Sequence, residues 1–253
     1  MISNSKAWDY LRPHLGLDSW SFGDFFDPAD LDRLHAVIVT ASSYQMEAHI
    51  ERHEFFDIAI RNREALRVWA AQEAVVTNAF SQILLQTCAQ IRNVHLRAAF
   101  MPVIAGEHHV VRKGIAEHSH PWLLRRLCLS LELEPEKIKP LPFTVTFIEV
   151  LSKSTRNTLI ALGALGVGNE RMLPPEYTAV KKCFEVAWPD SDYQGFLDAN
   201  IAEDETHTQI IEVVASGLIK NDEDAQDFLL GAKLGVDARV AYYNQLVDYI
   251  ERN

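Results

Sequence analysis

Apolar residues recur at helical spacing along nearly the whole chain, and this periodicity is the strongest constraint on the fold. At about 100° per residue, positions three and four apart share one face of a helix. No convincing alternation of apolar and polar residues and no Asn-Gly hairpin signal indicates a strand. The sequence therefore predicts an all-α bundle of about seven to eight helices, near residues 28–50, 62–92 with one break, 95–111, 120–133, 143–168, 174–187, 192–219 and 222–251.

The breaks between these helices are short and are marked by Pro and Gly, as in "EPEKIKPLP" and "LPPE". None is long enough to act as a linker between two domains. Residues 1–27 are rich in Trp, Phe and Asp, which suggests an extension that packs on the bundle. We therefore expect one helical domain over residues 28–253, preceded by an N-terminal extension over residues 1–27.

Charge and composition exclude several classes of partner. The formal net charge is -11, whereas nucleic-acid binding requires a basic face. No stretch approaches the roughly 20 apolar residues of a membrane span, and the N-terminus shows no basic leader followed by an apolar run. Cys88, Cys128 and Cys183 lack Cys-x-x-Cys spacing, which argues against a disulfide framework or a zinc knuckle. We expect a cytoplasmic protein that binds neither nucleic acid nor a membrane, with its cysteines in the core.

The stretch "NIAEDETH", residues 200–207, places polar side chains on an apolar helix face. Asn200, Asp204 and His207 fall on the same stripe as Phe196 and Ile211. Burying such groups without partners costs about 2 to 7 kcal/mol for a neutral group and more for a charge. The pattern therefore indicates that these three side chains meet a binding partner inside the protein.

Three other predicted helices carry inward polar residues of the same kind. Glu170 shares a face with leucines and glycines in "LIALGALGVGNERML", Glu107 lies in line with Phe100 and Ile104, and His120 opens a leucine-rich helix. Helical bundles with such residues commonly bind a metal between their helices, and carboxylates combined with imidazoles suit iron or manganese. The sequence therefore predicts a metal site between four helices.

Other assignments remain open. Glu170 could pair with an arginine, Asp204 and His207 could form an ordinary ion pair, and Glu107 could neutralise a neighbouring histidine. Glu149 is a further carboxylate that could point inward. Rival ligands lie on the same segments: His108 and His118 as alternatives to His120, Glu117 to Glu107, and Glu203 to Asp204.

Four segments, in order, resemble a known superfamily: "HEFFDIAI…LRVWAAQEAVVTNAFSQIL", "GEHHVV…SHPWLLRRLCLSLEL", "LGALGVGNERMLPPEY" and "FLDANIAEDETH". They are similar to the haem-oxygenase-like superfamily, in the branch that contains thiaminase II, the pyrroloquinoline quinone biosynthesis protein C and the haem-oxygenase-like diiron oxidases. The resemblance covers roughly residues 50–250. It implies a haem-oxygenase-like helical bundle.

The diiron oxidases imply a particular set of metal ligands. Their pattern is a Glu, a His that opens the next helix, a later Glu, and then His-x-x-x-Asp-x-x-His. The matching residues here are Glu107, His120, Glu170, Asp204 and His207, whereas the first His of the last motif is replaced by Asn200. An amide oxygen is a weak, neutral ligand, so Asn200 is expected to be a weak ligand or a substrate contact, and one or two metals per chain remain possible.

The resemblance also implies a chemistry. It suggests that one or two ferrous ions per chain activate dioxygen as co-substrate, and that the enzyme oxidises a small metabolite resembling an amino acid, an amine or a fatty acid. A homodimer is common in folds of this kind and is expected here. Trp69, Phe80 and Trp122 are candidates for an apolar wall around the site, although core packing is the simpler role for each.

Two alternative functions follow from the same resemblance. One is a cofactor-free enzyme similar to the quinone-biosynthesis protein or to thiaminase II. The thiaminase reaction uses a Cys nucleophile, for which Cys88 or Cys128 could be nominated, but both lie in apolar runs that do not favour a thiolate. The other alternative is a non-catalytic interaction protein, since a fold does not by itself imply a function.

Overall fold

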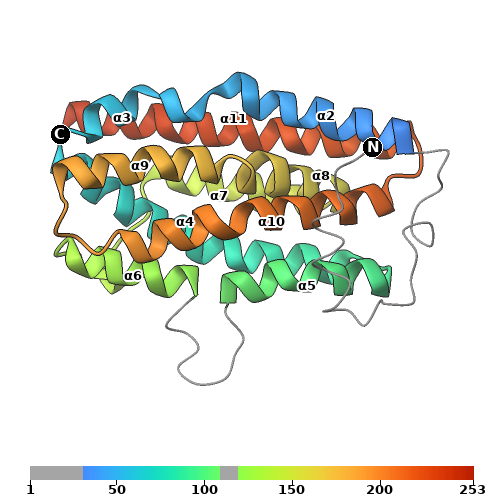
Figure 1. Cartoon of the computed structure of the whole chain (residues 1–253), viewed down its shortest axis with the longest axis horizontal. Helices are drawn as coiled ribbons and strands as arrows, with labels where there is room; N and C mark the ends of the chain where they lie inside the picture. Colours follow the sequence, from blue (N-terminus) through green and yellow to red (C-terminus); the bar gives the residue numbers. More distant parts are fainter. Residues whose placement is uncertain (1–30, 109–118) are drawn as a thin grey trace.

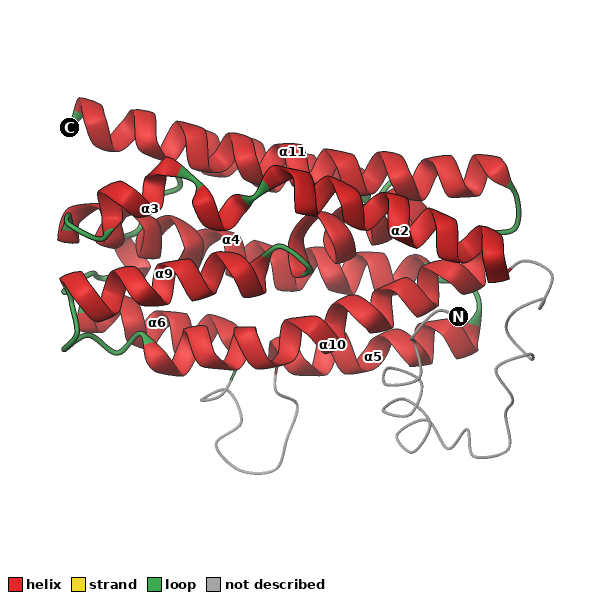
Figure 2. Ribbon diagram, turned by 45° about the horizontal axis from the view of Figure 1, so that its top comes forward, coloured by secondary structure: helices red, strands yellow, loops and turns green. Residues whose placement is uncertain are grey.

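The computed structural model describes residues 31–108 and 119–253, and within these ranges it contains helices and turns but no strand (Figures 1 and 2). This confirms the predicted all-α class. The helices are α2 (Leu31–Ala48), η3 (Ile50–Arg52), α3 (Glu54–Ala59), α4 (Arg63–Gln90), α5 (Val94–His108), α6 (His120–Ser130), η5 (Pro135–Lys137), α7 (Pro142–Ser154), α8 (Thr158–Leu162), η6 (Gly163–Glu170), α9 (Leu173–Ala187), α10 (Gln194–Leu218) and α11 (Asp222–Arg252).

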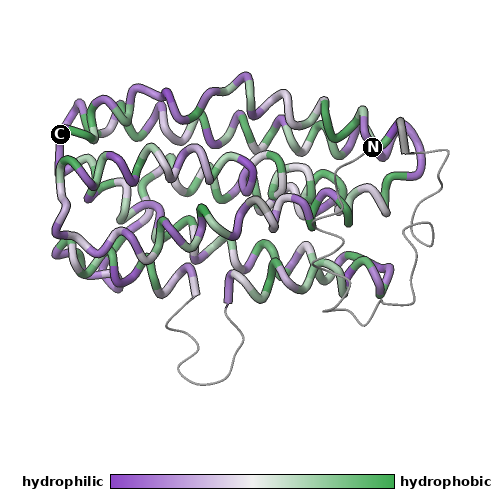
Figure 3. The backbone as a smooth tube through the Cα atoms, in the orientation of Figure 1, coloured by the Kyte–Doolittle hydropathy of each residue, from purple (hydrophilic) through white to green (hydrophobic). Residues whose placement is uncertain are grey.

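The long helices run roughly along the longest axis of the molecule. In Figure 1, α2 and α11 lie side by side along the top, α5 and α6 lie along the opposite edge, and α4, α9 and α10 lie between them. Most helices have one apolar face, which appears in Figure 3 as green alternating with purple along each tube. Because these faces turn inward, large side chains such as Trp69, Phe100 and Phe228 are fully buried.

Two of the predicted helices differ from those observed. The segment expected to break once between residues 62 and 92 is the continuous helix α4. The single helix expected over residues 143–168 is instead divided into α7, α8 and the π-helix η6. The division occurs at Asn157, whose side-chain oxygen accepts from the backbone N–H groups of Leu159 and Ile160 and so begins a new helix. The predicted extension over residues 1–27 lies outside the described residues.

The π-helix η6 is held against α11 by close backbone contact. A Cβ on Gly163 would lie 2.1 Å from the carbonyl oxygen of Phe228, and a Cβ on Gly235 would lie 2.6 Å from that of Ala164. Only glycine permits this approach. The contact fixes η6 in the interior, and all eight of its residues are buried.

None of the helices in the described ranges combines the length and apolar composition that crossing a bilayer would require.

Candidate metal centre

Four helical segments bring acidic and imidazole side chains together inside the bundle. Glu107 lies in the last turn of α5, His120 is the first residue of α6, Glu170 ends η6, and Asp204 and His207 lie one turn apart on α10. Each of these five residues is at most 4% exposed. The sequence placed all five on inward faces, and the structure buries them all. We call this set the carboxylate–imidazole cluster.

Local structure explains how two of these residues are positioned. The Ser119 hydroxyl caps α6 by accepting from the backbone N–H of Trp122 at 3.4 Å, and Pro121 suits the first turn of the helix. This cap fixes where α6 begins and therefore where His120 points. Glu170 ends a π-helix, an uncommon form that is often found at functional sites.

One ring nitrogen of His120 is hydrogen-bonded, and the other is not. Its Nδ1 lies 2.8 Å from Oε1 of Glu107. Because an ionised carboxylate only accepts hydrogen bonds, Nδ1 is the donor. The Nε2 atom is buried without a hydrogen-bond partner among the described residues. A carboxylate that binds one nitrogen and leaves the other toward a site is the usual arrangement for a metal-binding histidine.

His207, Glu170 and Asp204 approach one another without forming hydrogen bonds. Nδ1 of His207 lies 3.5 Å from Oε2 of Glu170 and 3.8 Å from Oδ1 of Asp204. In the described part of the chain, neither the four carboxylate oxygens nor Nδ1 has a hydrogen-bond partner. Such distances are long for a hydrogen bond, but ligands about 2.1 Å from one octahedral cation lie about 3 to 4 Å apart.

Glu107, Glu170 and His207 also satisfy a wider geometric test for a metal site. One ligand atom from each of Glu107, Glu170 and His207 lies within 4.8 Å of the other two. A buried orphan oxygen costs about as much as a lost hydrogen bond, and a charged one costs more. A divalent cation would compensate these orphaned atoms, and the mixture of carboxylates and imidazoles fits iron or manganese. The residues therefore fit a metal ion.

The pKa values reflect excess negative charge in the cluster. Burial and the neighbouring Glu170 carboxylate raise the pKa of Asp204 well above its usual value. Burial alone would lower the pKa of His120, but the Glu107 carboxylate raises it well above its usual value. In turn, His120 lowers the pKa of Glu107 despite the burial of that carboxyl group. The site thus favours positive charge.

Gly106 makes the space that His207 occupies. A Cβ at position 106 would lie 2.5 Å from Nε2 of His207 and 3.3 Å from Oε2 of Glu203. Contacts under 3 Å between these atoms do not occur without movement, so any larger residue would displace the imidazole. This role of Gly106 was not predicted from the sequence, although its position directly before Glu107 was a signal for it.

Asn200 is buried but lies to one side of this cluster. Its amide nitrogen donates to the carbonyl oxygen of Phe196 at 2.7 Å, which ties the side chain to its own helix. It also lines a small cavity of about 10 Å³, together with Glu107, Asn169, Tyr177 and other residues. A cavity of this size holds about one water molecule. Asn200 thus faces a polar cavity beside the cluster.

The structure also shows the positions of several residues that were alternative ligands or ion-pair partners. The His108 ring bonds to the carbonyl oxygen of Ile104 at 3.0 Å, and Glu117 and His118 lie outside the described residues. Glu149 is exposed and pairs with Lys153. Arg171 pairs with Glu212, not with Glu170. Glu203 does reach the cluster, since its Oε2 lies 3.5 Å from Nε2 of His120.

The three aromatic candidates for an apolar wall lie in different environments, and the cysteines lie in the core. Trp69 is fully buried, Phe80 lines the small cavity, and Trp122 is 36% exposed. Cys88, Cys128 and Cys183 are buried and free, as expected for core cysteines. Burial raises the pKa of the Cys128 thiol to about 12 and that of Cys183 to about 11. These are poor conditions for a nucleophilic thiolate.

A second buried charged group was not anticipated from the sequence. Arg239 of α11 is fully buried, and its guanidinium donates to Glu176 of α9 and to Glu73 of α4. The Tyr243 hydroxyl donates to Glu176 at 2.6 Å, and the Tyr177 hydroxyl donates to Glu73 at 3.0 Å. We call Arg239, Glu176 and Glu73 the Arg239 cluster. It adjoins the small cavity, which Glu73 and Tyr177 also line.

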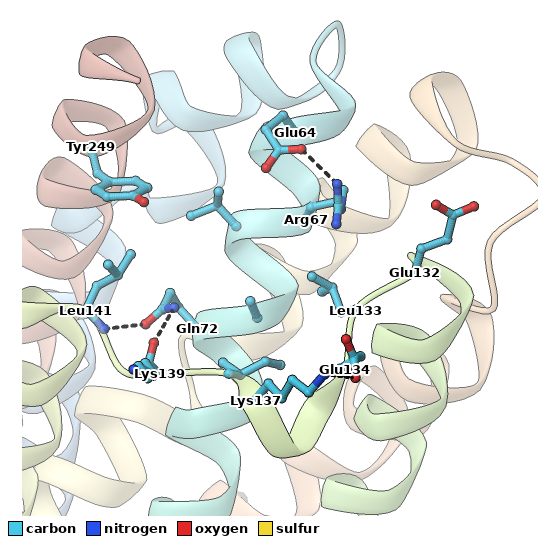
Figure 4. Close-up of a pocket in the computed structure, with 13 residues that line it drawn as sticks. Glu64, Arg67, Gln72, Glu132, Leu133, Glu134, Lys137, Lys139, Leu141 and Tyr249 are labelled. Carbon is cyan, nitrogen blue, oxygen red and sulfur yellow. Dashed lines mark hydrogen bonds and ion pairs between the residues drawn. The ribbon is translucent and has the colours of Figure 1, made fainter.

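A larger surface hollow, shown in Figure 4, is lined by residues with a structural role. Four of its charged side chains form two ion pairs, Arg67 with Glu64 and Lys137 with Glu134. Gln72 binds the segment before α7, accepting from Leu141 N at 2.8 Å and donating to Lys139 O at 3.3 Å. The hollow therefore holds a loop in place and shows no set of orphaned polar side chains like that of the carboxylate–imidazole cluster.

Solved structures with similar folds support the haem-oxygenase-like architecture. A CADD-like protein of unknown function from Nostoc punctiforme is 14% identical with a TM-score of 0.72, covering 86% of this chain and 98% of that one. A TenA homologue from Pseudomonas syringae is 11% identical with a TM-score of 0.66, covering 85% and 92%. A domain of unknown function with a haem oxygenase-like fold from Shewanella denitrificans is 17% identical with a TM-score of 0.62, covering 89% and 94%. Comparison with curated protein sequences gives no match.

Carboxylates and imidazoles that converge inside a helical bundle are typical of proteins that hold a metal between their helices. The family model described as iron-containing redox enzyme matches residues 67–240, more than half of the chain. The chain belongs to this family.

Proposed function

We propose that this protein is a non-haem iron enzyme that activates dioxygen to oxidise or oxygenate a small metabolite. Glu107, His120, Glu170, Asp204 and His207 would hold the iron. Membership of the iron-containing redox enzyme family supports this chemistry. The observation that carries the proposal is the set of buried ligand atoms on Glu170, Asp204, His207 and His120 that have no hydrogen-bond partner among the described residues.

Each residue has a role in this proposal. Glu170 and Asp204 supply negative charge that balances a cation, and His207 lies between them. Glu107 orients His120 through the hydrogen bond to Nδ1. When bound, iron supplies the redox chemistry that these side chains lack. Phe196 packs its ring edge-on to His120 at 6.5 Å and would exclude water from that side of the site.

We propose a class of substrate and not a particular molecule. A small amino-acid-like, amine-like or fatty-acid-like metabolite is what the sequence resemblance implies. The cavity next to Glu107 combines polar groups on Thr77, Asn169 and Asn200 with apolar walls from Phe80 and Leu173. Because this cavity holds only about one water molecule, a metabolite that entered here would have to displace these side chains.

Anaerobic titration of the metal-free protein with ferrous iron, read by elemental analysis, tests the proposal. We expect stoichiometric uptake by the parent, followed by consumption of dioxygen when air is admitted. Replacing Glu170 with Gln keeps the shape of the side chain but removes its charge, so iron uptake should fall sharply. Equal uptake by the parent and the E170Q variant would show that the ligand assignment is wrong.

A metal-free reaction of the thiaminase type is the second candidate, because the chain shares its fold with a TenA homologue. A thiol nucleophile would need an electropositive and accessible setting. Cys128 has neither, since it is fully buried and its thiol faces the carbonyl oxygen of Ala70 at 3.5 Å. Absence of stoichiometric iron uptake in the titration would favour this candidate.

A further inference from the structure

We infer that Glu203 is an additional metal ligand and that, with Nε2 of His120, it forms a second cation position beside the one at Glu170, Asp204 and His207. This inference rests on the proposed function, because it adds a position to the same metal centre. It starts from the free nitrogen of His120. That atom is buried, has no hydrogen-bond partner among the described residues, and lies 3.5 Å from Oε2 of Glu203.

The hydrogen bond from His120 to Glu107 defines the direction of this position. With Nδ1 engaged by Oε1 of Glu107 at 2.8 Å, the ring can offer a metal only Nε2. That nitrogen points toward Glu203 on α10, not toward Glu107. The separation of 3.5 Å exceeds a good hydrogen bond, but it is the distance expected between two ligands of one cation. His120 and Glu203 are therefore arranged as a pair of ligands.

Two cation positions are consistent with the spacing of the imidazoles. The ring centroids of His120 and His207 lie 6.4 Å apart. The two histidines also use separate carboxylates, since His207 approaches Glu170 and Asp204 while His120 approaches Glu203. Glu107 lies between the two groups, because it binds His120 and also belongs to the ligand set with Glu170 and His207.

Glu203 also resolves the difficulty raised by Asn200. Asn200 uses its amide nitrogen to bind its own helix, and an amide oxygen is a weak ligand. Glu203 lies on α10 between Asn200 and Asp204 and offers a carboxylate, which is a better metal ligand than an amide. Its side chain is 34% exposed, so it can reach the cluster from the edge. The missing imidazole at position 200 is replaced by a carboxylate three residues later.

Counting bound Mn²⁺ tests this inference, because manganese binds similar ligands and its stoichiometry does not depend on turnover. Protein freed of metal is equilibrated with Mn²⁺, desalted and analysed for metal, and the bound ion is titrated by EPR. We expect two Mn²⁺ per chain for the parent and one for the E203Q variant. Affinity at the remaining position should stay within about threefold, and that at the lost position should fall by at least about tenfold.

The matched control is the D198N variant. Asp198 is an exposed carboxylate on the same helix, and it pairs with Lys181 away from the cluster. This variant should bind two Mn²⁺ like the parent. Because Glu203 is partly exposed, its amide replacement should leave the helical circular-dichroism spectrum unchanged.

The outcomes separate this inference from the proposed function. If the parent binds one Mn²⁺ and E203Q also binds one with equal affinity, Glu203 is no ligand, whereas the proposed iron-dependent function stands. If both bind two, Glu203 is again excluded. If the parent binds none, and ferrous iron is not taken up either, the proposed function itself is overturned.

Discussion

The carboxylate–imidazole cluster and the Arg239 cluster are both buried and acidic, and each contributes one carboxylate, Glu107 and Glu73, to the lining of one small cavity. They differ in how their charge is compensated. Arg239 donates to both Glu176 and Glu73, and tyrosine hydroxyls supply further hydrogen bonds. Glu170 and Asp204 have four oxygens without hydrogen-bond partners in the described part of the chain. Of the two clusters, only the Arg239 cluster contains a permanently charged cation.

This difference separates a structural role from a binding role. A buried arginine with two carboxylates has a pKa raised well above its ordinary value by those carboxylates, and it keeps its charge at all times. It therefore needs nothing from solution. A cluster with orphaned carboxylates is stable only because the rest of the fold compensates for it, or because it binds a cation. The following experiments test that distinction.

The largest expected effect comes from removing the internal cation. Replacing Arg239 with Met leaves Glu73 and Glu176 buried without a positive charge, which should cost about 3 to 5 kcal/mol in free energy of unfolding. Urea denaturation monitored by circular dichroism measures it. Adding E73Q and E176Q to this variant should recover much of the loss, since the carboxylates that lacked a partner become neutral. A cost below about 1 kcal/mol for R239M alone would show that the cluster is not structurally important.

The opposite behaviour is expected at Glu170. In metal-free protein, E170Q removes a charge that repels Asp204, so its free energy of unfolding should be no lower than that of the parent. Metal at 100 times its Kd should stabilise the parent by about 2.7 kcal/mol, which is about 5 to 10 °C in Tm. The variant should show almost no such shift. Thermal scans with and without Mn²⁺ measure both quantities, and a parent-like shift in E170Q would remove the contrast between the clusters.

Gly106 sharpens the comparison because it affects geometry without changing charge. In the G106A variant the new methyl group would meet Nε2 of His207, so metal affinity should fall by about tenfold or more, as for other residues that orient ligands. G195A is the matched control, since a Cβ there meets only Leu123 at 3.6 Å. Calorimetric titration with Mn²⁺ compares them. Equal affinities would mean that His207 moves without loss of binding.

The carboxylate–imidazole cluster could be predicted from the sequence because periodicity reports burial. Glu107, Glu170 and Asp204 each fall on an apolar stripe, and a charged residue on such a stripe is conspicuous. The same rule would have found Glu73, which lies in line with Trp69 and Val76. It was missed because a single inward carboxylate on a long helix suggests no chemistry until its partner is known.

The sequence alone could not show how the buried charge of each cluster is compensated. Glu73, Glu176 and Arg239 are separated by more than 60 residues from one to the next, so only the tertiary fold brings them together. The π-helical form of η6 is equally hidden, because it results from contact with α11 and not from local propensity. Periodicity indicates which side chains are buried, whereas long-range packing decides which of them find a partner.

The smallest effect on metal binding is expected from substitution of the buried cysteines, whose thiols stay protonated. With a pKa of about 12, Cys128 should be a thiolate in only about one molecule in 10⁴ at pH 8. A disulfide reagent should therefore react slowly with native protein and quickly with all three cysteines in denaturant. The C128A variant should bind Mn²⁺ as the parent does. Rapid labelling of native Cys128, with loss of activity, would instead favour thiol chemistry and would make the carboxylate–imidazole cluster a second structural group.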